Sequence, residues 1–147
     1  MLSVTSRDFL DMQIEEFIIS SEKVAHVQVG NSAEHALLVL TKTGYSSVPV
    51  LDFKYRLKGL VSTQMITDAI LGLDHIEYER LPDLKVDLVM QSPVPSIHIE
   101  EKFKKALDLL INHPFLCVVD DEETFLGILT RRVVLKQLKK HIYQKNE

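Results

Sequence analysis

The spacing of hydrophobic residues along this chain changes in the same order twice. Short alternating stretches at 27–29 and 97–99 predict β-strands, because successive side chains of a strand point to opposite faces. Apolar residues at helical spacing follow each stretch and predict amphipathic helices: Ala33, Ala36, Leu37 and Leu40, then Phe103, Ala106, Leu107, Leu110 and Ile111. The continuous apolar runs 48–51 and 116–119 predict buried strands.

A hairpin and a second helix complete each pattern. Each buried strand is followed by a turn and a return strand, expected at 52–55 and 57–61 and again at 120–123 and 125–129. A side chain suited to an N-cap precedes each helix that follows a turn or strand: Asn31 or Ser32, Ser62, and Thr130. The last helices are expected at roughly 64–73 and 132–142.

The two patterns are copies of one another. VPVLD at 48–52 returns as LCVVD at 116–120, an offset of 68, and the same offset pairs Gly59 with Gly127. Residues 14–18 resemble 86–90, so a short helix is expected to lead into each copy. The predicted organisation is a first repeat at 1–73 with its N-terminal helix, a charged linker at 74–85 with a short helix or turn ending before Pro82, and a second repeat at 86–147 with a C-terminal helix.

The order strand, helix, strand, strand, helix, with a VPV-L-D…L-x-G-[LI]-[VL]-[ST] core given twice, resembles the CBS domain. The resemblance covers nearly the whole chain. It implies the α/β (α+β) class, with tandem CBS repeats forming one pseudo-twofold Bateman module, and a disc-shaped homodimer. It also implies that adenine nucleotides bind in clefts between the copies.

Within this family, KVAHVQVGNSAEHALLVLTKTGYSSVPVLD together with GILTRRVVLKQL is similar to the small stand-alone bacterial proteins of the DarB/CbpB type. That similarity implies a non-catalytic cytosolic sensor of cyclic di-AMP. It further implies a regulated protein partner, such as the (p)ppGpp synthetase/hydrolase of the stringent response or pyruvate carboxylase.

Matching the family's motifs to this chain implies one well-equipped cleft, formed by Lys23, Val24, Ala25, His26, Tyr45, Ser46, Ser47, Val48, Pro49, Ile128, Thr130, Arg131 and Arg132. Its chemistry suits a nucleotide. A helix start offers free N–H groups to a phosphate, and one guanidinium group can bind two phosphate oxygens at once. Backbone groups beside Ala25 suit an adenine edge, and Tyr45 suits stacking at the rim.

One departure from the family's pattern bears on the ligand. Nucleotide-sensing repeats often read [ST]-x-x-D, whose aspartate accepts hydrogen bonds from ribose hydroxyls, but Met65 and Val133 occupy that position here. This favours cyclic di-AMP, whose 3′-oxygens are esterified, over AMP, ADP or ATP. A sensor of those nucleotides and a ligand-free interaction module stay open as alternatives. The second cleft, expected from 93–97, 114–117 and 62–65, has Thr63 and Gln64 in place of the arginines, so we expect one ligand per chain.

Composition and charge narrow the remaining classes. The formal charge is −4 and the pI is near 5.9, so general nucleic-acid binding is not expected. No apolar run is long enough for a bilayer, and the acidic N-terminus lacks the layout of a secretory signal, which predicts a cytoplasmic protein without membrane contact. Cys117 lies in an apolar run and is expected to be buried. The six histidines lack metal-ligand spacing and no catalytic motif occurs, so neither a metal nor an enzymatic activity is expected.

Overall fold

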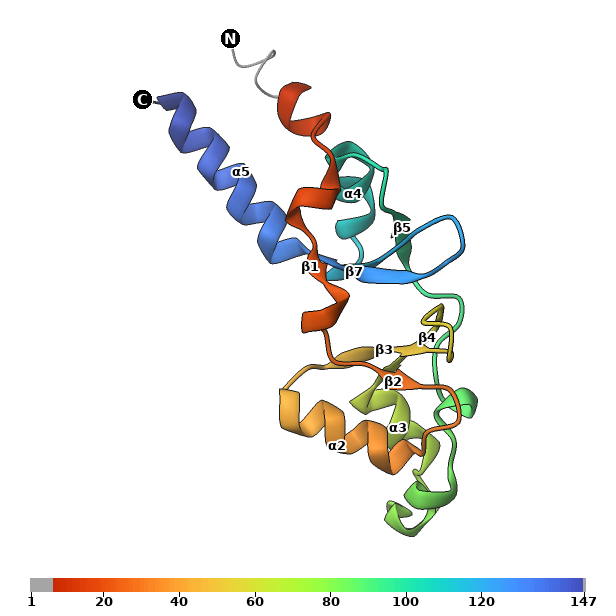
Figure 1. Cartoon of the computed structure of the whole chain (residues 1–147). Coiled ribbons are helices and arrows are strands. Elements are labelled where there is room, and N and C mark those ends of the chain that lie inside the picture. The colour runs from red at the N-terminus through yellow and green to blue at the C-terminus, as the bar shows by residue number, and fades with distance from the viewer. Residues whose placement is uncertain (1–6, 147) are drawn as a thin grey trace. The chain divides into compact units, whose positions relative to one another are not determined.

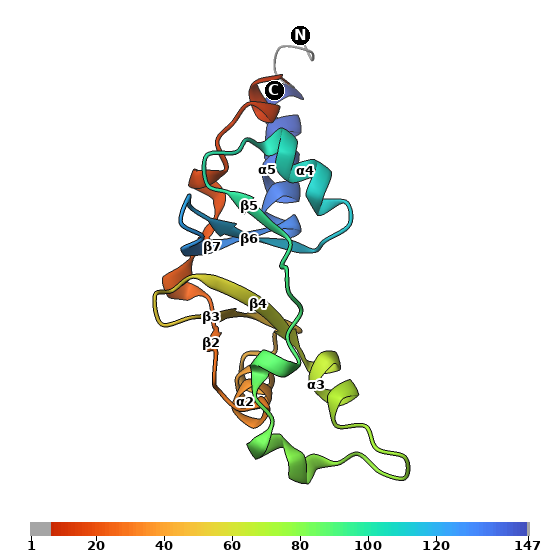
Figure 2. The same cartoon turned by 90° about the vertical axis from the view of Figure 1, so that its right-hand side faces the viewer.

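The computed structural model describes residues 7–146 and divides into two compact units. Unit 1 contains the described residues up to Val24 together with those from Pro95 onward, and unit 2 is Ala25–Val94. In each unit two helices cover one face of a small sheet (Figures 1 and 2). The mixed α/β class expected from the sequence is confirmed. No helix between residues 7 and 146 is both long and apolar enough to cross a membrane.

Unit 2 contains a three-stranded sheet in the order β2-β3-β4. Its elements are β2 (Val27–Gln28), α2 (Ala33–Thr43), β3 (Ser47–Leu51), β4 (Leu57–Ser62) and α3 (Thr63–Ala69). β2 pairs with β3 in parallel, with Val27 opposite Val50. β3 and β4 form an antiparallel hairpin that begins with Ser47 opposite Ser62.

Unit 1 repeats this arrangement and adds one edge strand. Its sheet has the order β1-β7-β6-β5. The elements are β1 (Ile19–Ser20), β5 (Ser96–His98), α4 (Phe103–Leu110), β6 (Phe115–Val119), β7 (Phe125–Thr130) and α5 (Arg131–Asn146). β5 pairs with β6 in parallel, and β6 with β7 in an antiparallel hairpin. The predicted repetition of strand, helix, hairpin and helix is therefore confirmed.

The predicted caps form, while two helix boundaries differ from those expected. The hydroxyl oxygens of Ser32, Ser62 and Thr130 accept the N–H groups of His35, Met65 and Val133. α3 ends at Ala69 rather than near Leu73, because the chain reverses at a turn in which the Gly72 N–H donates to the carbonyl of His75. α5 begins one residue earlier than expected and continues to Asn146.

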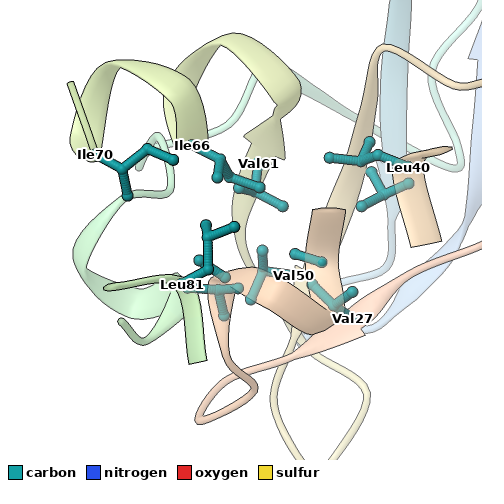
Figure 3. Close-up of a cluster of buried hydrophobic side chains, with 11 residues drawn as sticks. Val27, Leu40, Val50, Val61, Ile66, Ile70 and Leu81 are labelled. Atoms are coloured by element: carbon teal, nitrogen blue, oxygen red, sulfur yellow. The ribbon is translucent and has the colours of Figure 1, made fainter. Parts of the chain in front are cut away.

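The charged segment at 74–85 is part of the core of unit 2. Its 3₁₀ helix η3 (Tyr78–Asp83) buries Leu81, which lies among Val50, Ile66 and Ile70 (Figure 3). The helix does not end before Pro82, as the sequence predicted, but includes it. A short 3₁₀ helix tolerates proline because few of its N–H groups need an acceptor within the helix.

The segment that leads into each repeat packs against the other repeat. The 3₁₀ helix η1 (Ile14–Phe17) buries Ile14 in unit 1, and η4 (Val86–Leu88) buries Val86 in unit 2. Equivalent hydrogen bonds hold both segments: the Ile14 N–H donates to Glu101 and the Val86 N–H donates to Asn31. The hydrophobic core around one copy of the repeat is thus completed by residues that directly precede the other copy in the sequence.

The motif's glycine, Gly59 in the first copy and Gly127 in the second, is crossed closely by the segment that leads into the other copy. A Cβ on Gly59 would overlap the Met90 side chain, and a Cβ on Gly127 would overlap the carbonyl oxygen of Ile19. The Ile19 strand pairs with β7 directly beside that glycine. The glycine in L-x-G is therefore needed for a close crossing rather than for a turn.

Candidate functional site

The residues expected to bind a ligand occur in both units. Unit 1 holds Lys23, Val24, Ile128, Thr130, Arg131 and Arg132, and unit 2 holds Ala25, His26, Tyr45, Ser46, Ser47, Val48 and Pro49. Within unit 1, Thr130 ends β7 and the two arginines open α5. The antiparallel pairing of β6 with β7 fixes this strand end, with Phe115 opposite Thr130.

The start of α5 keeps one backbone donor available. The Arg131 N–H donates to the carbonyl of Pro114 at 2.9 Å, and the Val133 N–H donates to the Thr130 hydroxyl oxygen at 3.1 Å. Among hydrogen bonds of the described residues, none involves the Arg132 N–H. The helix start therefore offers an anion the Arg132 N–H, together with the partial positive charge of the helix terminus.

The Arg131 side chain is engaged at the end of α4. Its Nε and Nη2 donate to the Leu110 carbonyl at 3.0 and 2.8 Å, and Nη2 also lies 3.5 Å from the Ile111 carbonyl. The last carbonyls of a helix lack partners within it, so the guanidinium group stabilises this helix end. The sequence predicted only a ligand contact here. Nη1 alone makes no hydrogen bond to a described residue.

Arg132 lines a shallow hollow on α5 that is formed largely by the apolar stems of cationic side chains. The hollow is lined by Arg131, Arg132, Leu135, Lys136 and Lys139. No carboxylate lines it, and none of the four cations forms an ion pair with a described residue. Lys139 instead lies with its Nζ 5.6 Å from the Tyr143 ring centroid. This surface suits a ligand with more than one negative charge.

The equivalent hollow on unit 2 has different chemistry. It is lined by Ser46, Ser47, Leu60, Ser62, Thr63, Gln64, Met65, Thr67 and Asp68. At the repeat offset of 68, Gln64 corresponds to Arg132 and Asp68 to Lys136. The motif has its aspartate position at Met65, so it does not predict Asp68, which lies one helical turn further along α3. Periodicity was the available signal, because positions three or four apart share a helix face.

The predicted residues of unit 2 differ in how far they are accessible. Val48 and Pro49 are buried within β3, so their side chains support the strand. Tyr45 is 48% exposed, and the Ser46 carbonyl accepts the Thr63 N–H at 3.3 Å. The half-buried His26 places its ring edge-on to Tyr55, with centroids 5.2 Å apart. Tyr45 and Ser46 are thus the accessible members of the predicted strand start.

Lys23 and Val24 lie at the edge of unit 1. Lys23 ends the 3₁₀ helix η2 (Ser21–Lys23) and is exposed, whereas Val24 is buried. The short strand before them pairs with β7, with Ile19 opposite Ile128. The structure therefore brings the segment containing Lys23 alongside the strand that ends at Thr130.

Two other potentially reactive side chains, Cys117 and His98, are buried or hydrogen-bonded within the fold. Cys117 is fully buried in β6, as predicted, and burial raises the pKa of its thiol to about 12, so the thiol is not a nucleophile at neutral pH. His98 receives the Glu100 N–H on Nδ1 and lies 2.6 Å from Asp121 through Nε2. Over the described part of the chain, no three His, Cys, Asp or Glu side chains are grouped to hold a metal ion.

Comparison with known proteins agrees with this architecture. The sequence model of the CBS domain matches residues 14–72 and 85–140. The chain is 51% identical, over the full length of both proteins, to Cyclic di-AMP receptor B of Bacillus subtilis. Solved structures with the same fold include CbpB of Listeria monocytogenes in complex with c-di-AMP, at 58% identity and a TM-score of 0.83 over 89% of this chain and 98% of that one.

A CBS domain-containing protein of unknown function from Bacillus anthracis is also similar. It is 54% identical, with a TM-score of 0.85 over 92% of this chain and 98% of that chain. The family match covers both copies of the repeat, and each copy builds the same sheet covered by two helices. From the repeat in its sequence, the fold of its two units and these relatives, this chain belongs to the CBS-domain family, as a tandem pair similar to cyclic di-AMP receptors.

Proposed function

We propose that this protein is a non-catalytic cytosolic receptor that binds cyclic di-AMP and thereby regulates a protein partner. The observation that carries the proposal is the hollow on α5, where four cations gather without a carboxylate and the Arg132 N–H is unused. Two phosphodiester groups match such a surface. The B. subtilis relative is named a cyclic di-AMP receptor and the L. monocytogenes relative is a complex with c-di-AMP, and both support the same ligand.

The proposed contacts divide by chemistry. Arg132 and the Nη1 group of Arg131 would bind phosphate oxygens, and the Thr130 hydroxyl would donate to them. The backbone at Ala25 would read an adenine edge, with Tyr45 stacking at the rim. The B. subtilis relative is named a receptor, which supports a receptor rather than an enzyme.

Isothermal titration calorimetry with cyclic di-AMP, AMP, ADP and ATP tests the ligand. We expect cyclic di-AMP to bind most tightly, with one ligand per chain. At a free concentration of about 100 Kd it should stabilise the fold by roughly 2.7 kcal/mol. Tighter binding of AMP would contradict the assignment, and no measurable binding of any of the four would favour a ligand-free interaction module.

One observation favours the alternative of an AMP, ADP or ATP sensor. Asp68 lines the hollow on α3 beside Ser46 and Ser62, and a carboxylate there suits free ribose hydroxyls. Asp68→Asn separates the two functions: it should reduce AMP binding if that hollow is the site, and it should leave cyclic di-AMP binding unchanged if the site includes Arg132.

We propose that the receptor is a homodimer and that its regulated partner is a (p)ppGpp synthetase/hydrolase or pyruvate carboxylase. On α5, Val134 and Leu138 pack into the core of unit 1, whereas Leu135 and Ile142 remain 56% and 50% exposed. Two exposed apolar side chains that lie two helical turns apart suit a second copy of the chain. Sedimentation of wild type and Ile142→Glu tests the dimer, which the substitution should weaken.

A further inference from the structure

The turns of the two β-hairpins share one backbone geometry. Asp52 Oδ1 accepts the N–H groups of Lys54 and Arg56, both at 2.9 Å, and Asp120 Oδ1 accepts those of Glu122 and Thr124, also at 2.9 Å. The fourth residue of each turn has a positive φ, 67° at Tyr55 and 65° at Glu123. The aspartate therefore holds the turn, and the side chains that follow it are not needed for this geometry.

Those following side chains have opposite chemistry in the two turns. The second turn carries Asp121, Glu122 and Glu123, the ordinary solvated surface of an acidic protein. The first carries Phe53, Lys54 and Tyr55, which we call the aromatic turn. Phe53 is 85% exposed, and among residues 7–146 its ring is contacted by Lys54 alone, whose Nζ lies 5.9 Å from the ring centroid. The fold of unit 2 gains little from this phenylalanine.

The charge at the aromatic turn is positive. Asp52 is buried and paired with Arg56 at 2.8 Å, so its negative charge is neutralised. Lys54 is exposed and forms no ion pair with a described residue. An exposed phenylalanine beside an unpaired cation, on a turn fixed by four hydrogen bonds to Asp52, is a preorganised anchor for a complementary surface.

The aromatic turn also contacts the predicted ligand-binding segment. The Tyr55 ring lies against His26, and His26 follows Ala25 directly in the chain. A ligand that displaces His26 would therefore change the packing of Tyr55. This contact gives a physical route by which ligand binding alters the surface of the turn.

We infer that the aromatic turn docks the regulated protein partner, through an apolar pocket with an acidic rim on that partner. The inference rests on the proposed function and adds to it the surface used. The acidic turn of a second copy is a poorer occupant, because it supplies charge but no apolar pocket for Phe53. Phe53 would fill the pocket, and Lys54 would face the carboxylates of the rim.

The test measures binding of the purified full-length chain to the purified (p)ppGpp synthetase/hydrolase and, separately, to pyruvate carboxylase, by biolayer interferometry. Phe53→Ala should weaken binding to the partner at least tenfold, and Lys54→Glu should weaken it similarly. The matched control is Glu122→Lys at the equivalent position of the other turn, which should leave partner binding within twofold. Calorimetry with cyclic di-AMP should give the wild-type affinity for all three variants.

The outcomes separate the two proposals. If wild type binds a partner and Phe53→Ala binds it equally well, the docking surface is wrong while the proposed function stands. If wild type binds cyclic di-AMP but neither enzyme, the proposed regulation of these partners is wrong, and the docking surface falls with it. If Phe53→Ala changes the sedimentation of the chain alone, the occupant is a second copy, which also overturns the inference.

Discussion

The guanidinium group of Arg131 caps the carboxyl end of α4, donating to the carbonyl oxygen of Leu110 through both Nε and Nη2. The equivalent helix of the other repeat ends differently: Gly44 adopts a left-handed conformation with φ 78°, and its N–H donates to the Leu40 carbonyl. The second repeat is two residues shorter here and has no glycine. A side chain from the start of α5 therefore performs the capping that a glycine performs in the first copy.

This position predicts that Arg131→Ala lowers stability as well as ligand affinity. Loss of these partly buried hydrogen bonds to a helix end should cost about 1 kcal/mol of unfolding free energy, measured by urea denaturation. Arg131→Lys should recover little of it, because an ammonium group does not present two parallel donors. Full stability of Arg131→Ala would contradict the capping role.

Arg132→Ala should separate affinity from stability. Its guanidinium group has no partner among the described residues, so removing it should leave the urea midpoint within error of wild type. A lost charge-assisted hydrogen bond to a phosphate costs about 1.5–3 kcal/mol, which is roughly a ten- to 150-fold loss of affinity for cyclic di-AMP. Lys140→Ala is the control, since it removes a charge from α5 outside the hollow and should change Kd less than twofold. An unchanged Kd for Arg132→Ala would remove Arg132 from the site.

Alanine substitutions at the two equivalent glycines should lower the unfolding free energy by different amounts. Gly127→Ala should destabilise the fold by about 2–3 kcal/mol, because the added methyl meets the backbone carbonyl of Ile19 in a paired strand. Gly59→Ala should cost about 1 kcal/mol, because the nearest obstacle is the flexible Met90 side chain. Chemical denaturation of both variants checks the order, and equal losses would contradict this account of the motif.

The turn aspartates predict a dependence on acid pH. Burial alone would raise the pKa of Asp52, but hydrogen bonds and the charge of Arg56, with the Lys54 N–H, hold it below its ordinary value of 3.8. A carboxyl whose pKa is lowered by folding stabilises the protein above its unfolded pKa and loses that contribution as pH falls through the folded pKa. Asp52→Asn should therefore be less stable than wild type at pH 7, and the difference should shrink below about pH 4. A difference that stays constant from pH 7 to pH 2.5 would show that charge is not involved.

Ligand and partner should be reciprocally coupled. If saturating cyclic di-AMP weakens partner binding by some factor, a saturating partner must weaken cyclic di-AMP binding by the same factor. Calorimetry with and without the partner measures one side of this cycle and interferometry the other. The affinity of Arg132→Ala for the partner should stay unchanged over the range of cyclic di-AMP concentrations at which this variant remains unliganded. Equal partner affinity with and without bound ligand would leave a binding protein without a switch.

Much of this fold was predictable because its signals are local or repeated. The strand, helix and hairpin order follows from apolar spacing, and the caps at Ser62 and Thr130 follow from residue type at a strand end. What the sequence did not reveal depends on contacts distant along the chain. The engagement of Arg131 with Leu110, the place of Leu81 in a core, and Asp68 in the hollow on α3 each require knowing which segments meet.

The segment that precedes each repeat packs into the core that contains the other repeat, and this affects when each core can form during synthesis. Unit 2 needs Leu81 and Val86 in its core, so it cannot be complete until synthesis has passed the segment once expected to be a linker. The core of unit 1 needs both Ile14, which precedes the first repeat, and Val134, which lies in the second, so it is completed only after all of unit 2 has been synthesised. A cut placed between the two repeats would therefore release two incomplete cores rather than two domains. Although the chain contains two copies of one repeat, neither copy is a self-sufficient folding unit.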